Sequence, residues 1–521
     1  MHREFIFEGV ERTHPDFLRD ESRCVGSADA LALPRTEKEL CVALAVARER
    51  GWAVTVQGGR TGLTGGAVPD GGLIINLTRM NRVLGLRQTA DGKFIGIVQP
   101  GVVLQDLRRM LIAREFDTMG WNDESLAALG ALRAASSPYF FAPDPTESTA
   151  TLGGMAACNA SGACSFRYGA MRQHVVALRL VLPDGDVVAL RRGEVCAQGR
   201  EFVLRTETQR RLAGRLPAYT MPDTKNAAGY FAADDMDLMD LFVGSEGTLG
   251  IFSELELQFL PDPVARWGVL AFFPDQETAV RCVLAIRALG DMQLAALEFF
   301  DRHALNLLRC ERTNRAALSD LPELSVHFDT AVYVEIHAPD DAMGAATTDK
   351  LLACGIDGEN SWMATTAHDM EKFKAFRHAL PEAVNRLIDE RRKKKPSLTK
   401  LGTDMAVPDH QLTTVLERYR LDLKGAGLDY VIFGHIGDNH LHVNILPASE
   451  TDYQRGRELY LGWAADVVKL GGTVAAEHGI GKLKAPLLKT MFGPHGIEEM
   501  RSTKLIFDPD MRLNAGNLFS R

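Results

Sequence analysis

The chain has 521 residues, of which 46% are hydrophobic and 24% are charged, and its formal net charge at pH 7 is -9. Because this length exceeds what one hydrophobic core usually organises, we expect two or more lobes. The negative charge argues against a nucleic-acid-binding protein, which needs a basic surface. No apolar stretch reaches the roughly eighteen residues of a membrane span, so the composition predicts a soluble globular protein without a transmembrane segment.

Eight cysteines are scattered along the chain, and no two of them have the two-residue spacing of a metal knuckle or a redox dithiol. The simplest interpretation is a set of reduced thiols in a cytoplasmic protein that holds no iron–sulfur cluster of its own. Residues 1–5 show no basic-then-apolar signal segment, so we expect no export. The basic run Arg391–Lys395 before Pro396 is typical of a solvated helix end. Docking to an acidic partner or to the inner face of a membrane is the alternative.

Short strands and helices are predicted in the first half of the chain. Thr36 is placed to cap a helix with apolar residues at helical spacing, and Gly51 ends that helix. Apolar strands are expected at 53–56 and 72–77. Two more strands flank a Pro-Asp-Gly turn within residues 175–190, which predicts a hairpin.

Two prolines mark the best candidate for a domain boundary. Leu255, Leu257 and Phe259 alternate with polar residues, as in a half-buried strand, and Pro261 and Pro263 then interrupt the chain. We therefore predict a boundary near residue 263.

Strands and helices alternate beyond this boundary. Strand patterns at 267–273 and 331–337 are each followed by a helix pattern, at 277–289 and 342–353. Such units predict an α+β lobe whose sheet is covered by helices on one face. The expected domains are residues 1–263, with a helical insertion of unassigned role at about 111–138, residues 264–480, and a C-terminal segment, 481–521, that returns to the first domain.

A glycine-rich loop follows the predicted strand at 53–56. Its residues are Gly58, Gly59, Arg60, Thr61, Gly62, Leu63, Thr64, Gly65 and Gly66. Glycines at this density let backbone amides approach an anion, such as the phosphate of a cofactor. The spacing matches neither a Walker loop nor the dinucleotide-binding pattern that opens a helix. Taken alone, the loop fits a flexible connection equally well.

Two further polar, glycine-containing segments favour a large cofactor. The second segment contains Pro143, Asp144, Thr151, Gly153, Gly154, Asn159, Gly162, Tyr168 and Gly169, and the third, residues 244–251, contains Glu246, Gly250 and Ile251. Three such segments interleaved with strands are more than chain turns require. A cofactor with a pyrophosphate, a ribose and an aromatic ring would use all of them.

Four histidines and one glutamate lie in two short segments of the C-terminal half. His435, His440 and His442 belong to a turn and the strand after it, and Glu477 and His478 follow downstream. A single histidine is most often a structural residue. Imidazoles and a carboxylate grouped in this way can converge on one metal ion and leave positions open for a substrate. The sequence therefore predicts a catalytic metal site.

Together these motifs resemble those of the FAD-linked oxidases of the vanillyl-alcohol oxidase and p-cresol methylhydroxylase superfamily, over residues 30–519. The match is greatest to the branch of D-lactate dehydrogenase, glycolate oxidase and D-2-hydroxyglutarate dehydrogenase. The resemblance implies an α+β fold: a two-part FAD-binding domain of the p-cresol methylhydroxylase type, an α+β substrate (cap) domain and a helical C-terminal segment.

The resemblance also implies where FAD lies. Loop 58–66 would hold the pyrophosphate, residues 143–169 would lie along the flavin, and residues 244–251 with Asn514 would complete the site. Some members of the superfamily attach FAD covalently through a histidine in or near the first loop. This loop contains no histidine, so we expect non-covalent FAD.

The same resemblance implies roles for the second site. His435, His442 and Glu477 correspond to the ligands of a divalent metal ion, implied to be zinc, and His478 corresponds to the catalytic base. Arg377 resembles the arginine that clamps the substrate carboxylate. Lys400 is a second candidate cation for the substrate, and a solvated surface position is its alternative.

His440 is a departure from the pattern of this branch. The usual sequence is Gly-Asp-Gly-Asn-Leu-His, whereas residues 437–442 read Gly-Asp-Asn-His-Leu-His. In a strand, His440 and His442 would lie on the same side. We keep His442 as the ligand because its spacing from His435 matches the family, and the role of His440 stays open.

We therefore expect metal-assisted oxidation of a D-2-hydroxy acid, D-lactate foremost, to the 2-oxo acid by hydride transfer to FAD. The sequence shows no heme motif, cluster cysteines or nicotinamide fingerprint, so an external acceptor is implied: quinone, cytochrome c, an electron-transfer flavoprotein or an iron–sulfur subunit. The alternatives are a D-2-hydroxyglutarate dehydrogenase or glycolate oxidase subunit, an oxygen-using oxidase of the same fold, and a non-catalytic flavin subunit of an electron-transfer complex. A homodimer is left open.

Overall fold

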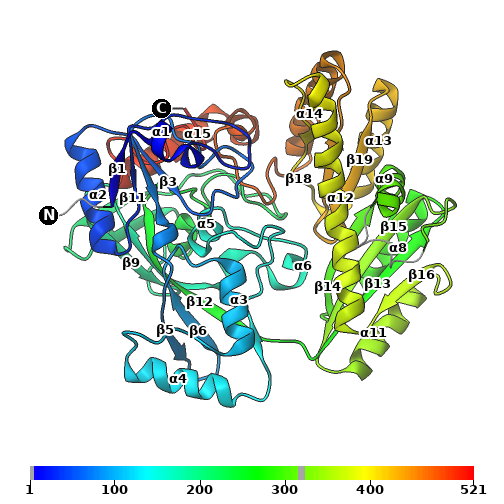
Figure 1. Ribbon diagram of the computed structural model, residues 1–521, viewed down its shortest axis with the longest axis horizontal. Helices are drawn as coiled ribbons and strands as arrows, with labels where there is room; N and C mark the ends of the chain where they lie inside the picture. Colours follow the sequence, from blue (N-terminus) through cyan, green and yellow to red (C-terminus); the bar gives the residue numbers. More distant parts are fainter. Residues whose placement is uncertain (1–4, 315–322, 521) are drawn as a thin grey trace.

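The structure is a computed structural model that describes residues 5–314 and 323–520. Figure 1 shows two lobes side by side, with the last helix of the chain lying on the first lobe. We call residues 5–262 and 485–520 the N-lobe, residues 263–472 the C-lobe, and residues 473–484 the return segment. Residues 1–4, part of the stretch in which we find no signal segment, lie outside the described ranges. Within those ranges, no helix is long and apolar enough to cross a membrane.

The first sheet of the N-lobe has four strands in the order β1-β2-β4-β3. They are β1 (Ile6–Glu8), β2 (Ala30–Ala32), β3 (Val54–Gln57) and β4 (Leu73–Asn76), with β2 and β3 parallel to β4. Helix α2 (Glu37–Glu49) packs against β4, and the Thr36 hydroxyl accepts a hydrogen bond from the Glu39 amide. The cap and both strands are as the sequence predicts.

A second sheet of the N-lobe has the strand order β5-β6-β12-β8-β9, and β7 pairs with β12. Its strands are β5 (Val83–Gln88), β6 (Phe94–Val98), β7 (Tyr139–Phe140), β8 (Val175–Val181), β9 (Val187–Arg191) and β12 (Ile251–Pro261). The predicted hairpin is the antiparallel pair β8–β9. Residues 111–138 contain the end of α3 (Leu104–Ala113) and all of α4 (Asp123–Ala134), which packs on β5 with Leu129 and Leu132 buried.

Shorter elements and the C-terminal segment complete the N-lobe. They are α1 (Val10–Thr13), α5 (Leu152–Ala157), α6 (Ser165–Tyr168), α7 (Met239–Phe242), β10 (Glu201–Arg205), β11 (Arg211–Arg215) and α15 (Ala485–Phe507). Helix α15 packs against β11, and Leu513 forms a bridge with Val54 of β3. The end of the chain therefore contacts the first sheet.

The C-lobe is built on an eight-stranded sheet with the order β16-β13-β15-β14-β19-β20-β17, and β18 pairs with β20. Its strands are β13 (Ala265–Phe273), β14 (Leu294–Phe300), β15 (Thr330–Ala338), β16 (Ser361–Ala364), β17 (Leu401–Gly402), β18 (Met405–Ala406), β19 (Tyr430–His435) and β20 (His440–Ile445). Strands β12 and β13 belong to different sheets, and we propose the boundary near residue 263 between them.

Helices cover both faces of this sheet. They are α8 (Gln276–Ala288), α9 (Arg302–Asn314), α11 (Asp341–Ala353) and α12 (Ala367–Lys394), with α13 (Leu412–Ala426) and α14 (Glu450–Lys469) nearby. Val269 of β13 belongs to the same buried cluster as Val283 of α8, whereas Leu270 belongs to the cluster of Phe376 in α12. The expectation of one covered face was wrong. Strands β13, β14 and β15 are nearly continuous apolar runs, which is typical of strands buried on both sides.

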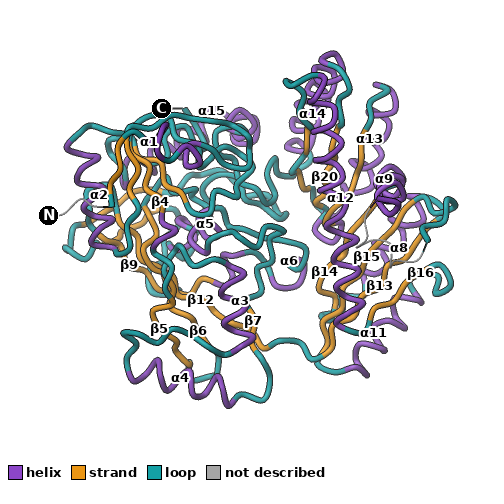
Figure 2. The backbone as a smooth tube through the Cα atoms, viewed as in Figure 1, coloured by secondary structure: helices purple, strands orange, loops and turns teal. Residues whose placement is uncertain are grey.

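Helix α12 is the longest of the described helices, with 28 residues, and contains Pro381. It ends at Lys394, so the basic run Arg391–Lys395 is the end of a helix, as the sequence indicates. Figure 2 shows this helix on the side of the C-lobe that faces the N-lobe. Its residues can therefore line the space between the two lobes.

Candidate active site

A cavity of about 440 Å³ lies where the glycine-rich segments of the N-lobe meet the return segment. We call it the glycine-lined cavity. The predicted cofactor residues in its wall are Gly58, Gly59, Arg60, Thr61, Gly62, Leu63, Thr64, Gly66, Thr151, Gly153, Gly154, Gly162, Glu246, Gly250, Ile251 and Asn514. Asn385 of α12 and Glu477 and His478 of the return segment also line it. Three segments that are distant in sequence therefore converge on one space.

The first two glycine-rich segments pack so closely that side chains are excluded between them. A Cβ atom at Gly58 would lie 2.2 Å from Thr151 Oγ1, and one at Gly59 would lie 2.9 Å from the carbonyl oxygen of Thr149. The wall is therefore mainly backbone at these points. Such a wall fits the phosphates of a nucleotide cofactor, which exposed backbone amides can approach.

Glu246 and Asn514 hold the wall together. The buried Glu246 carboxylate accepts hydrogen bonds from the amides of Ile480 at 2.6 Å and Gly481 at 2.8 Å. Asn514 accepts from the Val56 amide at 2.7 Å and donates to the Glu246 carbonyl at 2.6 Å. Burial raises the pKa of Glu246, although the two amides oppose that effect. These contacts join strand β3, the third segment, the return segment and the end of the chain.

Six other residues predicted to bind the cofactor lie off this wall: Gly65, Pro143, Asp144, Asn159, Tyr168 and Gly169. Gly65 and Gly169 have φ angles of 72° and 75°, which favour glycine. The Asn159 side chain accepts a hydrogen bond from the Arg172 amide at 3.0 Å. These residues shape the segments that carry the wall.

The remaining three residues, Pro143, Asp144 and Tyr168, form hydrogen bonds away from the wall of the cavity. The Asp144 carboxylate accepts from the Cys164 amide at 3.2 Å, and the Pro143 carbonyl accepts from an arginine of α3 at 3.0 Å. The Tyr168 hydroxyl forms a hydrogen bond of 2.9 Å with His337 Nδ1 of β15, which joins the two lobes. The sequence could not distinguish a wall residue from one that supports the wall or the lobe contact.

The histidines of the second site lie on a β-hairpin of the C-lobe. Strands β19 and β20 are antiparallel, with Phe433 opposite His442 and His435 opposite His440. Gly434 between them has φ 128°, and a Cβ atom there would lie 2.8 Å from the His442 ring. The glycine therefore lets the imidazoles pack side by side.

The three imidazoles surround the carboxylate of Glu477. His435 Nε2 is 3.2 Å from Glu477 Oε1, and His442 Nε2 is 4.0 Å from Oε2. His440 Nδ1 is 3.9 Å from Oε2, so the structure adds His440 to the predicted group. One donor atom from each of the four residues lies within 4.8 Å of the others. Such a donor set fits a divalent transition metal.

The outer nitrogens of two imidazoles are held by oxygen atoms. His435 Nδ1 lies 2.6 Å from Glu298 Oε1 of β14, and His442 Nδ1 lies 3.2 Å from the Thr403 carbonyl oxygen. This arrangement fixes which nitrogen faces Glu477, as is typical of metal-ligating histidines.

Charges compensate one another within this group. Burial favours neutral forms, but the carboxylates of Glu298 and Glu477 outweigh it and raise the pKa of His435 to about 10. Burial lowers the pKa of both His440 and His442. Burial would raise the pKa of Glu477, yet Lys225 and His435 hold it well below its usual range. Lys225 Nζ lies 2.5 Å from Glu477 Oε1, so one carboxylate oxygen is already neutralised by cations.

His478 follows Glu477 and faces the glycine-lined cavity, and a third of its side chain is exposed. Its Nδ1 lies 3.4 Å from Asp404 Oδ2. The Asp404 carboxylate also accepts from the amides of Glu477 at 3.2 Å and His478 at 3.1 Å. Asp404 therefore fixes the backbone of the candidate metal ligand, Glu477, and of the candidate base, His478.

Arg377 and Lys400 occupy different surroundings. Arg377 of α12 lies 3.9 Å from Glu298 and 3.6 Å from Glu335, which places it next to the carboxylate that holds His435. Lys400 Nζ donates to Asn385 Oδ1 at 2.9 Å, and Asn385 lines the cavity. Arg377 therefore belongs to the cluster, whereas Lys400 reaches the cavity only through Asn385.

Sequence reasoning missed Glu298, Glu335, Asp404 and Lys225. Glu298 and Glu335 could have been recognised from the sequence, because each is an isolated carboxylate in an otherwise apolar strand. A buried charge of this kind needs a partner. Asp404 and Lys225 had no sequence signal that we can identify. Their partners lie more than 70 residues away in the sequence.

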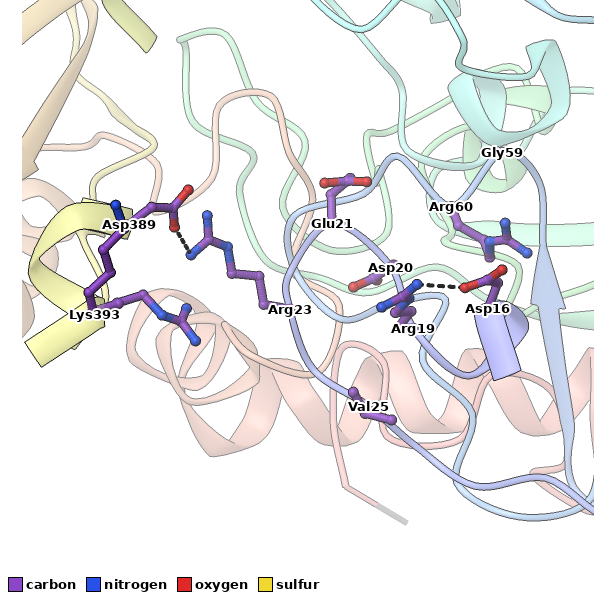
Figure 3. Close-up of a pocket in the computed structure, with 11 residues that line it drawn as sticks. Asp16, Arg19, Asp20, Glu21, Arg23, Val25, Gly59, Arg60, Asp389 and Lys393 are labelled. Atoms are coloured by element: carbon purple, nitrogen blue, oxygen red, sulfur yellow. Dashed lines mark hydrogen bonds and ion pairs between the residues drawn. The ribbon is translucent and has the colours of Figure 1, made fainter. Parts of the chain in front are cut away.

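A second, open pocket of about 860 Å³ lies on the other side of the first loop, and Gly59 and Arg60 line both spaces. Figure 3 shows Arg23 of the N-lobe meeting Asp389 of α12 there, with an ion pair of 3.0 Å. The ends of the two lobes therefore touch beside the cofactor loop.

Fold and site define a two-lobed protein with a glycine-lined cavity where the N-lobe meets the return segment, and a histidine and carboxylate cluster beside it. Residues 28–123 and 129–191 match the family model described as FAD binding domain. Residues 263–518 match the model described as FAD linked oxidases, C-terminal domain. The chain belongs to the FAD-linked oxidases, its cofactor is FAD, and the predicted resemblance is confirmed.

Relatives over nearly the full length carry related names. Glycolate oxidase subunit GlcD of Bacillus subtilis is 27% identical over 95% of this chain and 89% of its own length. D-lactate dehydrogenase of Archaeoglobus fulgidus is 28% identical over 93% and 90%. D-2-hydroxyglutarate dehydrogenase of Xanthomonas citri pv. viticola is 28% identical over 94% and 89%. The chain is thus similar to proteins named for 2-hydroxy acids.

A solved structure confirms the fold class. Alkyldihydroxyacetonephosphate synthase superposes with a TM-score of 0.63 over 99% of this chain and 82% of its own, at 17% sequence identity. At this identity the likeness concerns the fold alone. The α+β architecture that we predict is therefore shared with a structurally known protein.

Proposed function

We propose that the chain oxidises a D-2-hydroxy acid to the 2-oxo acid, with D-lactate as the first candidate. FAD would lie non-covalently in the glycine-lined cavity. A divalent metal ion, zinc by the family resemblance, would be held by His435, His442 and Glu477. The observation that carries the proposal is that Glu477 and His478 are consecutive and both line the cavity. A metal ligand and a proton acceptor thus face the same space as the cofactor.

Different residues of the chain would bind the substrate and take its proton. Arg377 would bind the substrate carboxylate, because a guanidinium fork matches that group. His478 would take the proton of the substrate hydroxyl, and Asp404 orients its ring and backbone. When bound, FAD accepts the α-hydrogen with its electron pair, and the metal polarises the hydroxyl. The products are a 2-oxo acid and reduced FAD, whose electrons pass to an external acceptor.

A second candidate substrate is D-2-hydroxyglutarate, and the surroundings of Lys400 favour it. Among the ion pairs of the described residues, none pairs Lys400 with a carboxylate, and its ammonium group instead binds an amide that lines the cavity. Burial and the nearby Arg23 lower the pKa of Lys400. A second carboxylate on the substrate would give this cation a partner.

Anaerobic bleaching of the flavin across a panel of acids tests the proposal. D-lactate, D-2-hydroxyglutarate and glycolate would be compared with the L-isomers of the two chiral acids, with the oxidised flavin band as the readout. We expect reduction by one or more of D-lactate, D-2-hydroxyglutarate and glycolate, fastest with the physiological substrate class, and none by the L-isomers. If every D-acid and glycolate left the flavin oxidised, the chain would be better described as a non-catalytic flavin subunit.

A further inference from the structure

His440 occupies the centre of the imidazole cluster, although the usual pattern of this branch has asparagine there. Its side chain is 0% exposed. The centre of its ring lies 4.4 Å from that of His442 and 5.4 Å from that of His435. A residue in this buried position does not contact solvent, so its role must lie within the cluster.

The orientation of His440 follows that of the other two imidazoles. One ring nitrogen, Nε2, lies 3.0 Å from an outer oxygen, Asp404 Oδ1, and the other, Nδ1, faces Glu477 Oε2 at 3.9 Å. His442 Nε2 faces the same oxygen at 4.0 Å. His440 Nδ1 is buried and forms no hydrogen bond. A buried nitrogen without a partner, aimed at a carboxylate among other ligands, is the arrangement that a metal ion would satisfy.

The separations bring the donors close to one shared ion. Metal bonds of about 2.1 Å place adjacent donors of a six-coordinate ion ~3.0 Å apart and opposite donors ~4.2 Å apart. The distances of 3.9 Å and 4.0 Å from Glu477 Oε2 lie between these two values. Because an oxygen ligand has a single opposite donor, at least one of the two imidazoles would move about 1 Å toward Oε2 when an ion binds.

A purely structural role as partner of Asp404 explains His440 less well. The Asp404 carboxylate already accepts from the amides of Glu477 and His478 and lies 2.6 Å from Lys484 Nζ. The contact from His440 Nε2 is short but not aligned as a hydrogen bond. Asp404 would therefore be well partnered without it.

We propose that His440 is a fourth protein ligand, so that three imidazoles and Glu477 hold a six-coordinate ion. This inference rests on the proposed metal site, and it replaces the zinc ion with three protein ligands given there by a six-coordinate ion with four. Four protein ligands fill the coordination shell of tetrahedral zinc and leave no position for a substrate. The hydroxyl and carboxylate oxygens of a 2-hydroxy acid would complete six positions instead. The site then favours an ion that readily takes six ligands, such as Fe²⁺ or Co²⁺, over zinc.

Cobalt binding to the full-length flavoprotein tests this inference. After removal of metal with a chelator, Co²⁺ would be titrated into the wild-type protein, His440→Asn, His435→Asn and a control, His495→Asn, whose side chain is 88% exposed. With a D-2-hydroxy acid present and the flavin bleached by reduction, we expect the wild type to show the weak visible bands of six-coordinate Co²⁺. The Kd should rise at least about 10-fold in His440→Asn, a lower limit taken from the loss of an outer-shell partner. It should not change in His495→Asn.

X-ray absorption of the wild-type protein gives a second measurement that needs no variant. Three coordinated imidazoles would support the inference, and two would overturn it. An unchanged Kd and spectrum in His440→Asn, or an intense four-coordinate spectrum in the wild type, would also overturn it while leaving the proposed function intact. If the wild type bound no metal at all, the metal step of the proposed function would fail as well.

Discussion

Glu298 Oε1 lies 2.6 Å from His435 Nδ1, and the contact joins the neighbouring strands β14 and β19 of the C-lobe sheet. The same oxygen lies 3.9 Å from Arg377. One buried carboxylate thus orients a candidate metal ligand and neutralises the candidate substrate clamp. Loss of the Glu298 carboxylate should therefore affect both metal binding and substrate binding.

Replacement of Glu298 by glutamine should weaken metal binding roughly 10- to 100-fold, the usual effect of losing a partner that orients a ligating histidine. Glu335→Gln is a matched control, because Glu335 also contacts Arg377 but not His435. That variant should keep its metal affinity and show a raised KM. Metal titration followed by steady-state kinetics checks both variants, and equal metal affinity in the two would remove the role we give Glu298.

Metal binding should release about one proton below pH 10. Glu298 and Glu477 raise the pKa of His435 from 6.5 to about 10, so this imidazole is protonated at neutral pH before an ion binds. His440 and His442 have lowered pKa values and are already neutral. Affinity should therefore rise with pH and level off above about 10.

The same shift has a consequence for stability. Because the folded-state pKa of His435 is raised, its contribution to the stability of the metal-free fold is complete below about pH 6.5 and is lost as the pH rises through about 10.

Calorimetry of metal binding in buffers with different heats of ionisation would count the protons that are released when the metal binds. A release of none or of three would contradict the charge state described here.

His478→Ala should keep FAD and metal yet slow flavin reduction by roughly 10²- to 10⁴-fold, the usual contribution of a general base. His435→Ala should lose the metal while FAD stays bound, because His435 is not in the wall of the glycine-lined cavity. Stopped-flow absorbance and metal analysis separate the two effects. Turnover at the wild-type rate in His478→Ala would rule out this residue as the base.

Gly58→Ala should destabilise the protein by about 1–3 kcal/mol, because the new Cβ atom would lie 2.2 Å from Thr151 Oγ1. Gly62→Ala is a control in the same loop, where a Cβ atom meets nothing within 4 Å. Thermal unfolding of the FAD-free proteins would show a lower Tm for Gly58→Ala only. A similar loss in both variants would show that the close packing of the two segments is not the cause.

Local features of the fold were predictable from the sequence because they depend on neighbouring residues. The Thr36 cap and the hairpin around Pro183–Gly185 are examples. The grouping of the imidazoles was partly predictable, since the turn from His435 to His442 is short enough to form a hairpin. Strand periodicity also placed His440 and His442 on one side.

Other features depend on contacts that the sequence does not display. Asp404 meets Glu477 and His478 from 73 and 74 residues away, through a sheet edge that no local pattern specifies. To predict that helices cover both faces of the C-lobe sheet, the continuous apolar runs of its strands must count for more than the alternation of strand and helix. Tyr168 is a predicted cofactor residue because of its glycine-rich neighbours, and its hydrogen bond to His337 across the lobes is a contact that the sequence does not display.

The return segment is bonded to both lobes at once. Glu246 of the N-lobe holds the amides of Ile480 and Gly481, and Asp404 of the C-lobe holds those of Glu477 and His478. Because the candidate ligand Glu477 and the candidate base His478 are adjacent in sequence, no rotation of one lobe against the other can separate them. If the lobes part to release a product, the pair survives the movement intact and needs no reassembly before the next substrate enters.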